Sequence, residues 1–334
     1  MEDTVSTKPL TRETATALVH DATAAPSLHN AQPWRFRCCL GSRTLYVRSD
    51  PQRAVPHTDP HGRALHLGCG AALLNLRVAA VHGGWHPGTR LLPEPWDTEL
   101  LASVQLAFLE SGEGALDALY PAIRTRHTSR YPFEETEIPD AVRAALTDAA
   151  RDEGASLAFP TGRHLQEVLE LAREAEVRSL TDHGIGEELQ RWTHGGVPFS
   201  DTAAAGVPEY AFGPRKLSGK APMRDFSGGR PVPGRAAAEF EHRPHLALLS
   251  TARDRPEDWV SAGQAMERVL LLATLKGLSS SFVTQAVAWP DLRRALRNPA
   301  TGTGHVQVIL RIGYGPPGPA TPRSPMLDVL DIEP

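Results

Sequence analysis

The stretch APSLHNAQPW, at residues 25–34, decides the fold of this chain. It separates a predicted helix at 11–24 from a strand that opens at Trp34, because Pro and Ser end helices and start turns. Its polar residues can present side chains and backbone amides to the edge of a planar ligand. The same residues also suit a plain turn that leads into a strand, so both interpretations stay open here.

A second unusual stretch, RHTSRYPF, lies about a hundred residues later at 126–133. Arg126, His127, Thr128 and Arg130 bring cationic groups and a hydroxyl together on a short non-helical segment. A phosphate monoester is bound by such a set of charges and donors. The alternative is a solvated basic turn before a strand.

Composition limits the possible partners of the chain. Its 334 residues are 41% hydrophobic and 22% charged, which is typical of a globular protein. A formal net charge of -4 gives no electrostatic reason to expect nucleic acid or a membrane as partner. The three cysteines (Cys38, Cys39 and Cys69) form no C-x-x-C pair, and the polar N-terminus resembles no signal peptide. We therefore expect a cytoplasmic protein.

Periodicity and helix-ending signals predict an alternation of helices and strands. Helices are expected at 11–24, 64–81, from Pro139 onward, at 161–179 and at 257–276. Strands are expected at 34–40, 44–48, 104–109, 155–159, 244–250 and, as the last one, 306–312. The stretches 67–84 and 262–278 resemble each other, and both are apolar nearly all round. They predict an internal duplication whose two helices are buried against each other.

Residues 184–243 form an insertion with no counterpart in the first half. It is rich in Gly and Pro and carries aromatic residues that look exposed: Trp192, Phe199, Tyr210, Phe212 and Phe226. Loops of this length are usually disordered or functional lids, and the aromatic residues favour a lid.

Other candidate sites are weaker. The stretch GLSSSFVTQ at 277–285 either brings backbone amides beside a ligand or simply ends a helix. His57, His61 and His66 are grouped but lack the spacing of known metal motifs, so we predict no metal site. No G-x-S-x-G motif is present, so a hydrolase elbow lacks support.

With these residues in view, the chain resembles the nitroreductase superfamily and, more narrowly, the Acg family of FMN-binding oxidoreductases, from about residue 9 to 329. In that superfamily an R-[RH]-[ST]-x-R-x-[FY] segment opens the subunit and P-S-x-x-N-x-Q-P-W follows some thirty residues later. The family protein is a homodimer with FMN at its interface, and each subunit contributes one of the two segments to a given flavin.

The two segments occur here in reversed order, one in each half of the chain. The first half keeps 26–34 without an Arg-rich opening, whereas the second keeps 126–133 but reads GASLAF at 154–159, where the other motif would lie. The resemblance therefore implies an α+β, nitroreductase-like fold that is internally duplicated, so that one chain mimics the usual homodimer. We expect halves at 1–123 and 124–334, a lid at 184–243 and one surviving flavin site.

The resemblance also implies which residues bind the cofactor. Residues 277–285 align with the segment under the flavin ring, and Arg323 belongs to a closing motif that reaches the phosphate. The implied set is Pro26, Ser27, Leu28, Asn30, Gln32, Arg126, His127, Thr128, Arg130, Gly277, Leu278, Ser281, Val283, Thr284, Gln285 and Arg323. No side chain is singled out as a catalytic acid or base.

The implied activity is hydride transfer from NAD(P)H to N5 of FMN and onward to a small organic acceptor, in which the cofactor carries the chemistry. The main alternative is a protein whose closed lid sequesters the flavin or senses redox state with little turnover. A His-metal enzyme without flavin is a third, weaker reading. We expect a pseudo-dimeric monomer, although higher oligomers stay open.

Overall fold

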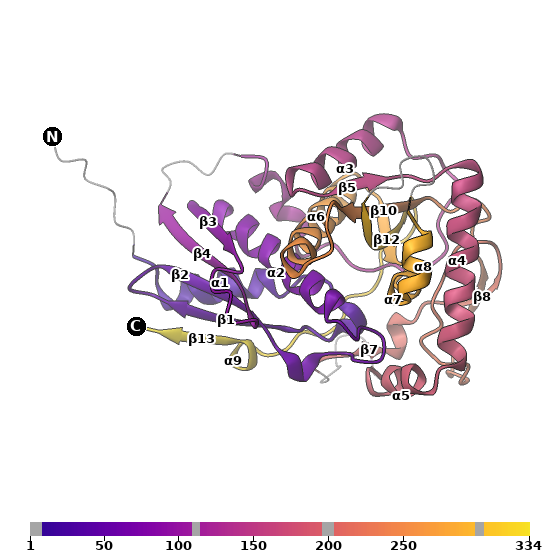
Figure 1. Cartoon of the computed structure of the whole chain (residues 1–334), viewed down its shortest axis with the longest axis horizontal. Coiled ribbons are helices and arrows are strands. Elements are labelled where there is room, and N and C mark those ends of the chain that lie inside the picture. Colours follow the sequence, from indigo (N-terminus) through magenta and orange to yellow (C-terminus); the bar gives the residue numbers. More distant parts are fainter. Residues whose placement is uncertain (1–8, 109–113, 196–203, 298–303) are drawn as a thin grey trace.

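The computed structural model describes residues 9–108, 114–195, 204–297 and 304–334. Each half of the chain builds its own sheet, and two long helices lie between the sheets (Figure 1). The fold is thus a mixed arrangement of helices and antiparallel-rich sheets.

The first half contributes five elements around its sheet and one helix at its start. These are α1 (Arg12–Ala22), β1 (Trp34–Cys39), β2 (Thr44–Ser49), α2 (Arg63–His82), β3 (Trp85–Leu91) and β4 (Leu100–Phe108). The sheet order is β13-β1-β2-β4-β3, in which the C-terminal strand β13 (Leu330–Glu333) runs parallel to β1. The end of the chain therefore returns to the first half.

The second half carries a four-stranded antiparallel sheet in the order β11-β12-β10-β5. Its strands are β5 (Ser156–Ala158), β10 (Leu246–Thr251), β11 (Ser279–Phe282) and β12 (His305–Gly313). Its helices are α3 (Asp140–Asp152), α4 (Gly162–Thr181), α5 (His183–Arg191), α6 (Pro256–Leu275), α7 (Gln285–Ala288), α8 (Pro290–Ala295) and α9 (Met326–Val329).

Helices α2 and α6 pack against each other at a crossing made by two glycines. A Cβ added to Gly70 would lie 2.2 Å from the carbonyl oxygen of Val260, and one added to Gly263 would lie 2.2 Å from that of Leu67. The contacts are reciprocal, because each glycine meets the carbonyl three residues before the other. The prediction that these two helices are buried against each other is confirmed.

One hydrophobic core joins the two halves. It runs from Trp34 and Phe36 under the first sheet, across α2 and α6, to Leu249 and Ile312 of the second sheet. Within the described residues, α2 is the one helix long and apolar enough to cross a membrane, and most of it is packed inside the fold, as core helices are.

The structure corrects several predicted elements. Strand β12 is not the last one, since β13 follows it, and β3 was missed because WHPGTRL contains Pro and Gly. Those residues are tolerated there because β3 lies at a sheet edge. The serine-rich β11 was also missed, and Pro139 precedes α3 as its N-cap rather than opening it.

The insertion is more structured than a loop. It contains most of α5, β6 (Thr193–His194), β7 (Val207–Pro208), β8 (Arg215–Ser218) and β9 (Ala237–Glu239). Phe212 and Phe226, expected to be exposed, are buried and stack on each other with ring centroids 5.9 Å apart. Phe199 lies outside the described residues.

Candidate active site

A cavity opens where the two halves meet, beside the N-terminal part of α2. It holds about 1260 Å³ of empty space, including the part that opens to solvent. Its walls come from the loop after α1, the segment before α3, the end of β11, and the insertion. The lining residues used below are Ser27, Leu28, His29, Asn30, Thr58, Arg63, Leu67, Arg126, His127, Thr128, Arg130, Arg224, Phe226, Met266, Ser281, Thr284, Val308, Thr321 and Arg323.

The loop after α1 is held in an unusual conformation. His29, Asn30 and Gln32 all have φ near +55°, a left-handed conformation that costs non-glycine residues about 1–3 kcal/mol each. Ser27 helps to fix the turn, because its Oγ accepts a hydrogen bond from the Gln32 amide at 2.8 Å. The surrounding contacts must therefore offset the strain of this loop.

Asn30 and Gln32 make those contacts with their side-chain amides. The Asn30 Nδ2 donates to the carbonyls of Gly206 and Pro322, both at 3.0 Å. The Gln32 Nε2 donates to the Ala204 carbonyl at 2.7 Å, and its Oε1 accepts from the Ser324 amide at 2.8 Å. These two amides thus join the loop of the first half to the insertion and the C-terminal tail.

The segment 126–130 is positioned by strand β11. Ser129 donates its amide to the Ser280 carbonyl at 2.8 Å and its hydroxyl to the Pro316 carbonyl at 2.7 Å. Because Ser129 is fully buried on that side, its neighbours Thr128 and Arg130 turn toward the cavity.

Three basic side chains form a first cationic cluster: Arg126, His127 and Arg323. Burial and the two arginines lower the pKa of His127 to about 4, so its imidazole is neutral. Burial, then Arg126, lowers the pKa of Arg323 to about 9, while Glu267 opposes that shift. Glu267 lies 3.4 Å from the Arg126 Nε, and burial raises the pKa of its carboxyl.

The two arginines of this cluster differ in how many hydrogen bonds their guanidinium nitrogens donate. Arg323 donates to the carbonyls of Thr23, Ala24 and Ala25, at the C-terminal end of α1, over 2.7–3.2 Å. It also donates to the Asn30 Oδ1 at 3.0 Å. Arg126 donates one bond, to the Ala24 carbonyl; its buried Nε makes the ion pair with Glu267 but no hydrogen bond, and its buried Nη1 has no acceptor among the described residues. The cluster therefore keeps free, buried cationic donors.

A second cationic cluster consists of Arg130 and Arg224, which both lie over the ring of Phe226. Their guanidinium carbons lie 4.6 Å and 5.7 Å from the ring centroid of Phe226. Burial, then Arg224, lowers the pKa of Arg130 to about 10. His29 contacts the edge of the same ring, and neither of its nitrogens has a partner among the described residues.

The insertion covers the cavity on this side. Arg130 donates to the Ala211 carbonyl at 2.9 Å, and a Cβ at Gly213 would lie 2.3 Å from the Arg130 carbonyl oxygen. Since Gly213 also has φ +70°, only glycine fits this approach. Residues of the insertion thus close directly onto the second cationic cluster.

A sequence model of the Nitroreductase family matches residues 123–314, more than half of the chain. The chain belongs to the nitroreductase family. Two proteins of Mycobacterium tuberculosis strain H37Rv, whose names describe them as candidate NAD(P)H nitroreductases, align over nearly all of it. Rv3131 is 32% identical over 96% of this chain and 91% of its own. The protein named acg is 30% identical over 97% of each chain.

Solved structures are more distant. A nitroreductase with bound FMN from Bacteroides fragilis covers 60% of this chain and 89% of its own, at 15% identity and a TM-score of 0.36. A BluB-like flavoprotein from Clostridium difficile covers 63% and 96%, at 13% identity and a TM-score of 0.40.

Most of the residues predicted for the site of this chain line the same cavity. These are Pro26, Ser27, Leu28, Asn30, Arg126, His127, Thr128, Arg130, Ser281, Thr284 and Arg323. Five others do not line it: Gln32, Gly277, Leu278, Val283 and Gln285. Leu278 and Val283 belong to the hydrophobic core, Gly277 ends α6 with φ +73°, and Gln285 donates to Glu176. For Gly277, the interpretation as a helix stop is the better one.

Several residues that line the cavity were not predicted. His29 stands inside the 26–34 motif, and its burial could have been suspected from its apolar surroundings. Arg63, Arg224 and Met266 carry no such signal, because single residues of these types occur elsewhere in the chain. In the part of the chain that the structure describes, no group of three or more His, Cys, Asp or Glu could hold a metal ion.

Proposed function

We propose that this chain is an FMN-dependent oxidoreductase that takes reducing equivalents from NAD(P)H and passes them to a small organic acceptor. One observation carries the proposal. The two signature segments, 26–34 and 126–133, lie a hundred residues apart in the sequence, yet both line the same cavity. The names of the mycobacterial relatives and of the B. fragilis structure support the choice of cofactor and reductant.

The first cationic cluster fits the phosphate of FMN. The buried Nη1 of Arg126 has no acceptor among the described residues, and its Nε has only the ion pair with Glu267. Buried donors without acceptors are unfavourable unless a ligand accepts from them. Arg323 adds a second charge, and the hydroxyls of Thr128 and Thr321 line the same cavity. Arginines are suited to such an anion because their planar forks bind oxygen pairs.

The rest of the cavity fits a flat, partly apolar ring. Leu28, Leu67, Met266 and Val308 line it, beside the polar edge formed by Ser281 and Thr284. When bound, FMN supplies the transfer of reducing equivalents, and the protein orients the reactants and excludes water. The neutral imidazole of His29 offers one hydrogen-bond donor and one acceptor to a small molecule at the lid side of the cavity.

We further propose that the chain is a fused pseudo-dimer with a single flavin site. Halves at 1–123 and 124–334 are supported by the two sheets, by the reciprocal contacts of Gly70 and Gly263, and by a family match that begins at residue 123. Such reciprocity is the mark of a two-fold interface between like units. A pseudo-dimeric monomer then needs no partner subunit to complete its site.

We propose that residues 184–243 act as a lid. A lid makes an alternative function possible, in which the protein sequesters the flavin. Phe226, Arg224 and the Ala211 carbonyl close on the cavity, so a firmly shut lid would sequester the flavin with little turnover. A lid that opens would admit the reductant and the acceptor. The three free cysteines, Cys38, Cys39 and Cys69, support our assignment of the protein to the reducing cytoplasm.

The test combines cofactor binding with anaerobic reduction. Apoprotein is titrated with FMN, and Arg126→Ala and Asn30→Ala are each expected to weaken binding at least tenfold, because both halves build the site. Arg124→Ala is the matched control, since Arg124 is exposed and pairs with Asp21 outside the cavity. It should bind FMN like the wild type.

Anaerobic addition of NADH or NADPH then separates the two functions. Bleaching of the flavin absorbance supports the enzyme. Photoreduction without any bleaching by NAD(P)H supports sequestration instead. A folded chain that cannot be reconstituted with FMN would refute both.

A further inference from the structure

A second cavity lies next to the first, and the function proposed above was argued without it. It holds about 2540 Å³ of empty space, including the part that opens to solvent. Its walls are built by both halves, from residues 58–66 and 92–99 on one side and from 254–259, 287–297 and 305–306 on the other. It is therefore also an inter-half site.

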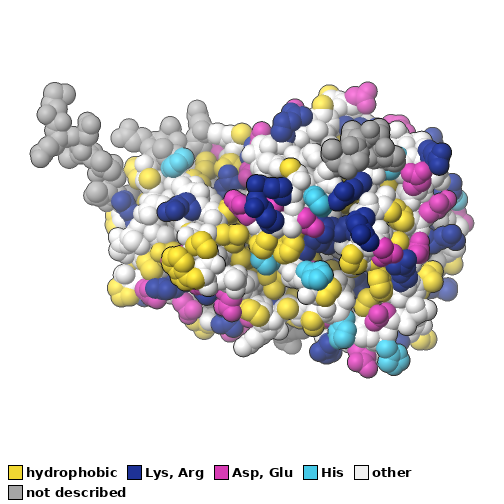
Figure 2. Space-filling model, in the orientation of Figure 1, with side chains coloured by type: hydrophobic (Ala, Val, Ile, Leu, Met, Phe, Trp, Pro, Cys, Tyr) yellow, Lys and Arg dark blue, Asp and Glu magenta, His cyan; other side chains and the backbone are white. Residues whose placement is uncertain are grey.

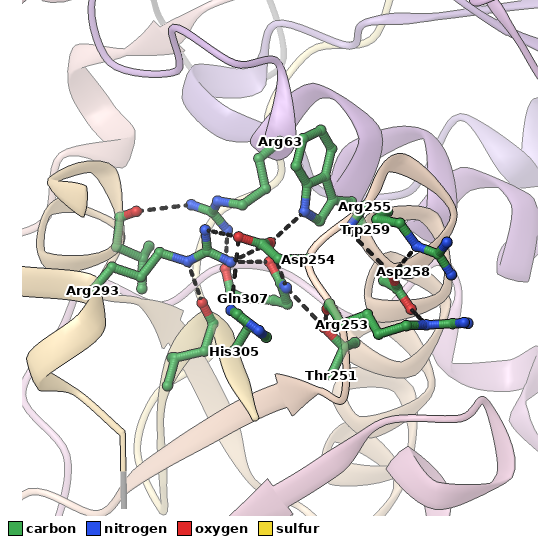
Figure 3. Close-up of polar contacts among 12 residues, drawn as sticks. Arg63, Thr251, Arg253, Asp254, Arg255, Asp258, Trp259, Arg293, His305 and Gln307 are labelled. Atoms are coloured by element: carbon green, nitrogen blue, oxygen red, sulfur yellow. Dashed lines mark hydrogen bonds and ion pairs between the residues drawn. The ribbon is translucent and has the colours of Figure 1, made fainter. Parts of the chain in front are cut away.

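A polar network stiffens one wall of this cavity (Figure 3). Arg293 donates two hydrogen bonds to Asp254, at 2.7 Å and 2.9 Å, and Asp254 also accepts from the Trp259 Nε1 at 2.7 Å. Gln307 links the same network to Thr251 at 2.8 Å. Trp259, whose ring is also contacted by the edge of His66, is thus held in place as an aromatic wall.

Side chains of both charges line the cavity, and only some of them are ion-paired. Asp254 is paired with Arg293, while Asp97 and Glu99 are paired with Arg48. Asp59, which accepts from the Leu65 amide, and Glu94, which is exposed, have no ion-pair partner among the described residues. Arg294 and Arg297 also have no carboxylate partner among the described residues, and both line the cavity. Figure 2 shows basic side chains gathered near the middle of this face, over the region between α6 and α8.

The two cavities are adjacent, because four residues line both: Thr58, Arg63, Val287 and Ala288. Arg63 stands at this junction with its guanidinium bonded to the carbonyls of Gln307 and Val287 and to no carboxylate. A long ligand that carries negative charge near its middle would pass a buried cation here. Basic groups, an aromatic wall and continuity with the flavin cavity together suit a phosphorylated nucleotide.

We propose that the second cavity binds the adenosine-diphosphate half of the dinucleotide reductant, with Arg294 and Arg297 on its phosphates and Trp259 beside its base. The nicotinamide end would then reach the first cavity past Arg63. This proposal rests on the proposed function, because it takes NAD(P)H as the reductant. It assigns the recognition of the reductant to a place that the lid does not cover.

The test measures binding of ADP-ribose, which carries the two phosphates and the adenosine but cannot donate hydride. FMN-loaded protein is titrated with ADP-ribose by calorimetry, and Arg294→Gln/Arg297→Gln is expected to weaken binding at least tenfold. The control, Arg253→Gln/Arg255→Gln, removes the same charge from exposed neighbours that do not line the cavity, and it should change binding less than twofold. Inorganic phosphate should bind at least tenfold more weakly than ADP-ribose.

Several results would overturn the proposal. These are the absence of ADP-ribose binding, equal binding by the Arg294/Arg297 variant, equal affinity for inorganic phosphate, or release of FMN on titration. The last would mean that the ligand competes for the first cationic cluster. If the protein holds no FMN, the proposed function fails while ADP-ribose binding is still measured on the purified chain, so the two failures are distinguishable.

Discussion

The crossing of α2 and α6 makes the sharpest stability prediction. Replacing Gly70 by alanine puts a Cβ 2.2 Å from the Val260 carbonyl oxygen and 3.0 Å from the Cα of Gly263. Ordinary contacts are longer than about 3.4 Å, and backbone atoms of a 20-residue helix cannot turn aside as a side chain can. The two helices must therefore move apart by about an ångström.

The expected cost follows from two opposing effects. Overpacking a core costs about 1–3 kcal/mol and occasionally more, and the contact here is at the severe end. Alanine in a helix interior recovers up to about 1 kcal/mol relative to glycine. We expect Gly70→Ala to lower the unfolding free energy by about 2 kcal/mol or more, and the melting temperature by about 3 °C or more. Gly263→Ala should behave alike.

Thermal melts followed by circular dichroism test this reasoning, with Gly186→Ala as control. Gly186 also lies in a helix, α5, but an added Cβ meets nothing within 4 Å, so this variant should be as stable as the wild type or more so. The double variant Gly70→Ala/Gly263→Ala should cost less than the sum of the single ones, because one separation relieves both contacts. A Gly70→Ala protein that melts with the wild type would refute the account of the crossing.

Three further predictions concern charge, the insertion and assembly. The pKa of His127 is lowered to about 4, so the neutral side chain contributes its full share to the unfolding free energy of the apoprotein above pH 6.5, and this share is lost as the pH drops toward 4. Denaturation of His127→Asn across that pH range should show a smaller loss of unfolding free energy than the wild type. Glu188 accepts hydrogen bonds from the amides of His57 and Thr58, at 2.9 Å and 3.0 Å, so Glu188→Gln should cost about 2 kcal/mol in urea melts, whereas the exposed Glu187→Gln should cost almost nothing. Light scattering should give a mass near 36.2 kDa, and a stable dimer would count against a self-sufficient pseudo-dimer.

The parts of the fold that the sequence predicted are those with strong local signals. The glycine-ended apolar helices were found and correctly paired, because an all-round apolar pattern means burial on every side. Strand β3 was missed because Pro87 and Gly88 are unusual in strands, and β13 was missed because it is only four residues long. Both are held by neighbouring strands, a tertiary effect that a local pattern does not reveal.

The candidate site was predicted where a motif supplied spacing. As expected, one cavity is lined by Ser27, Asn30, Arg126 and Arg130. The side-chain amide of Asn30, however, donates its hydrogen bonds to the insertion and the C-terminal tail. Arg224 could not have been found this way, since it reaches the site only through the fold of the insertion. The second cavity likewise joins residues whose positions in the sequence are unrelated.

The most direct test of a single flavin site shared by two halves is the stoichiometry of the reconstituted protein. Apoprotein of known concentration is saturated with FMN, freed of excess, and its flavin is released and counted against the chain. We predict one FMN per chain, in a species of monomeric mass. Two FMN per chain, or one FMN per two chains, would contradict the account.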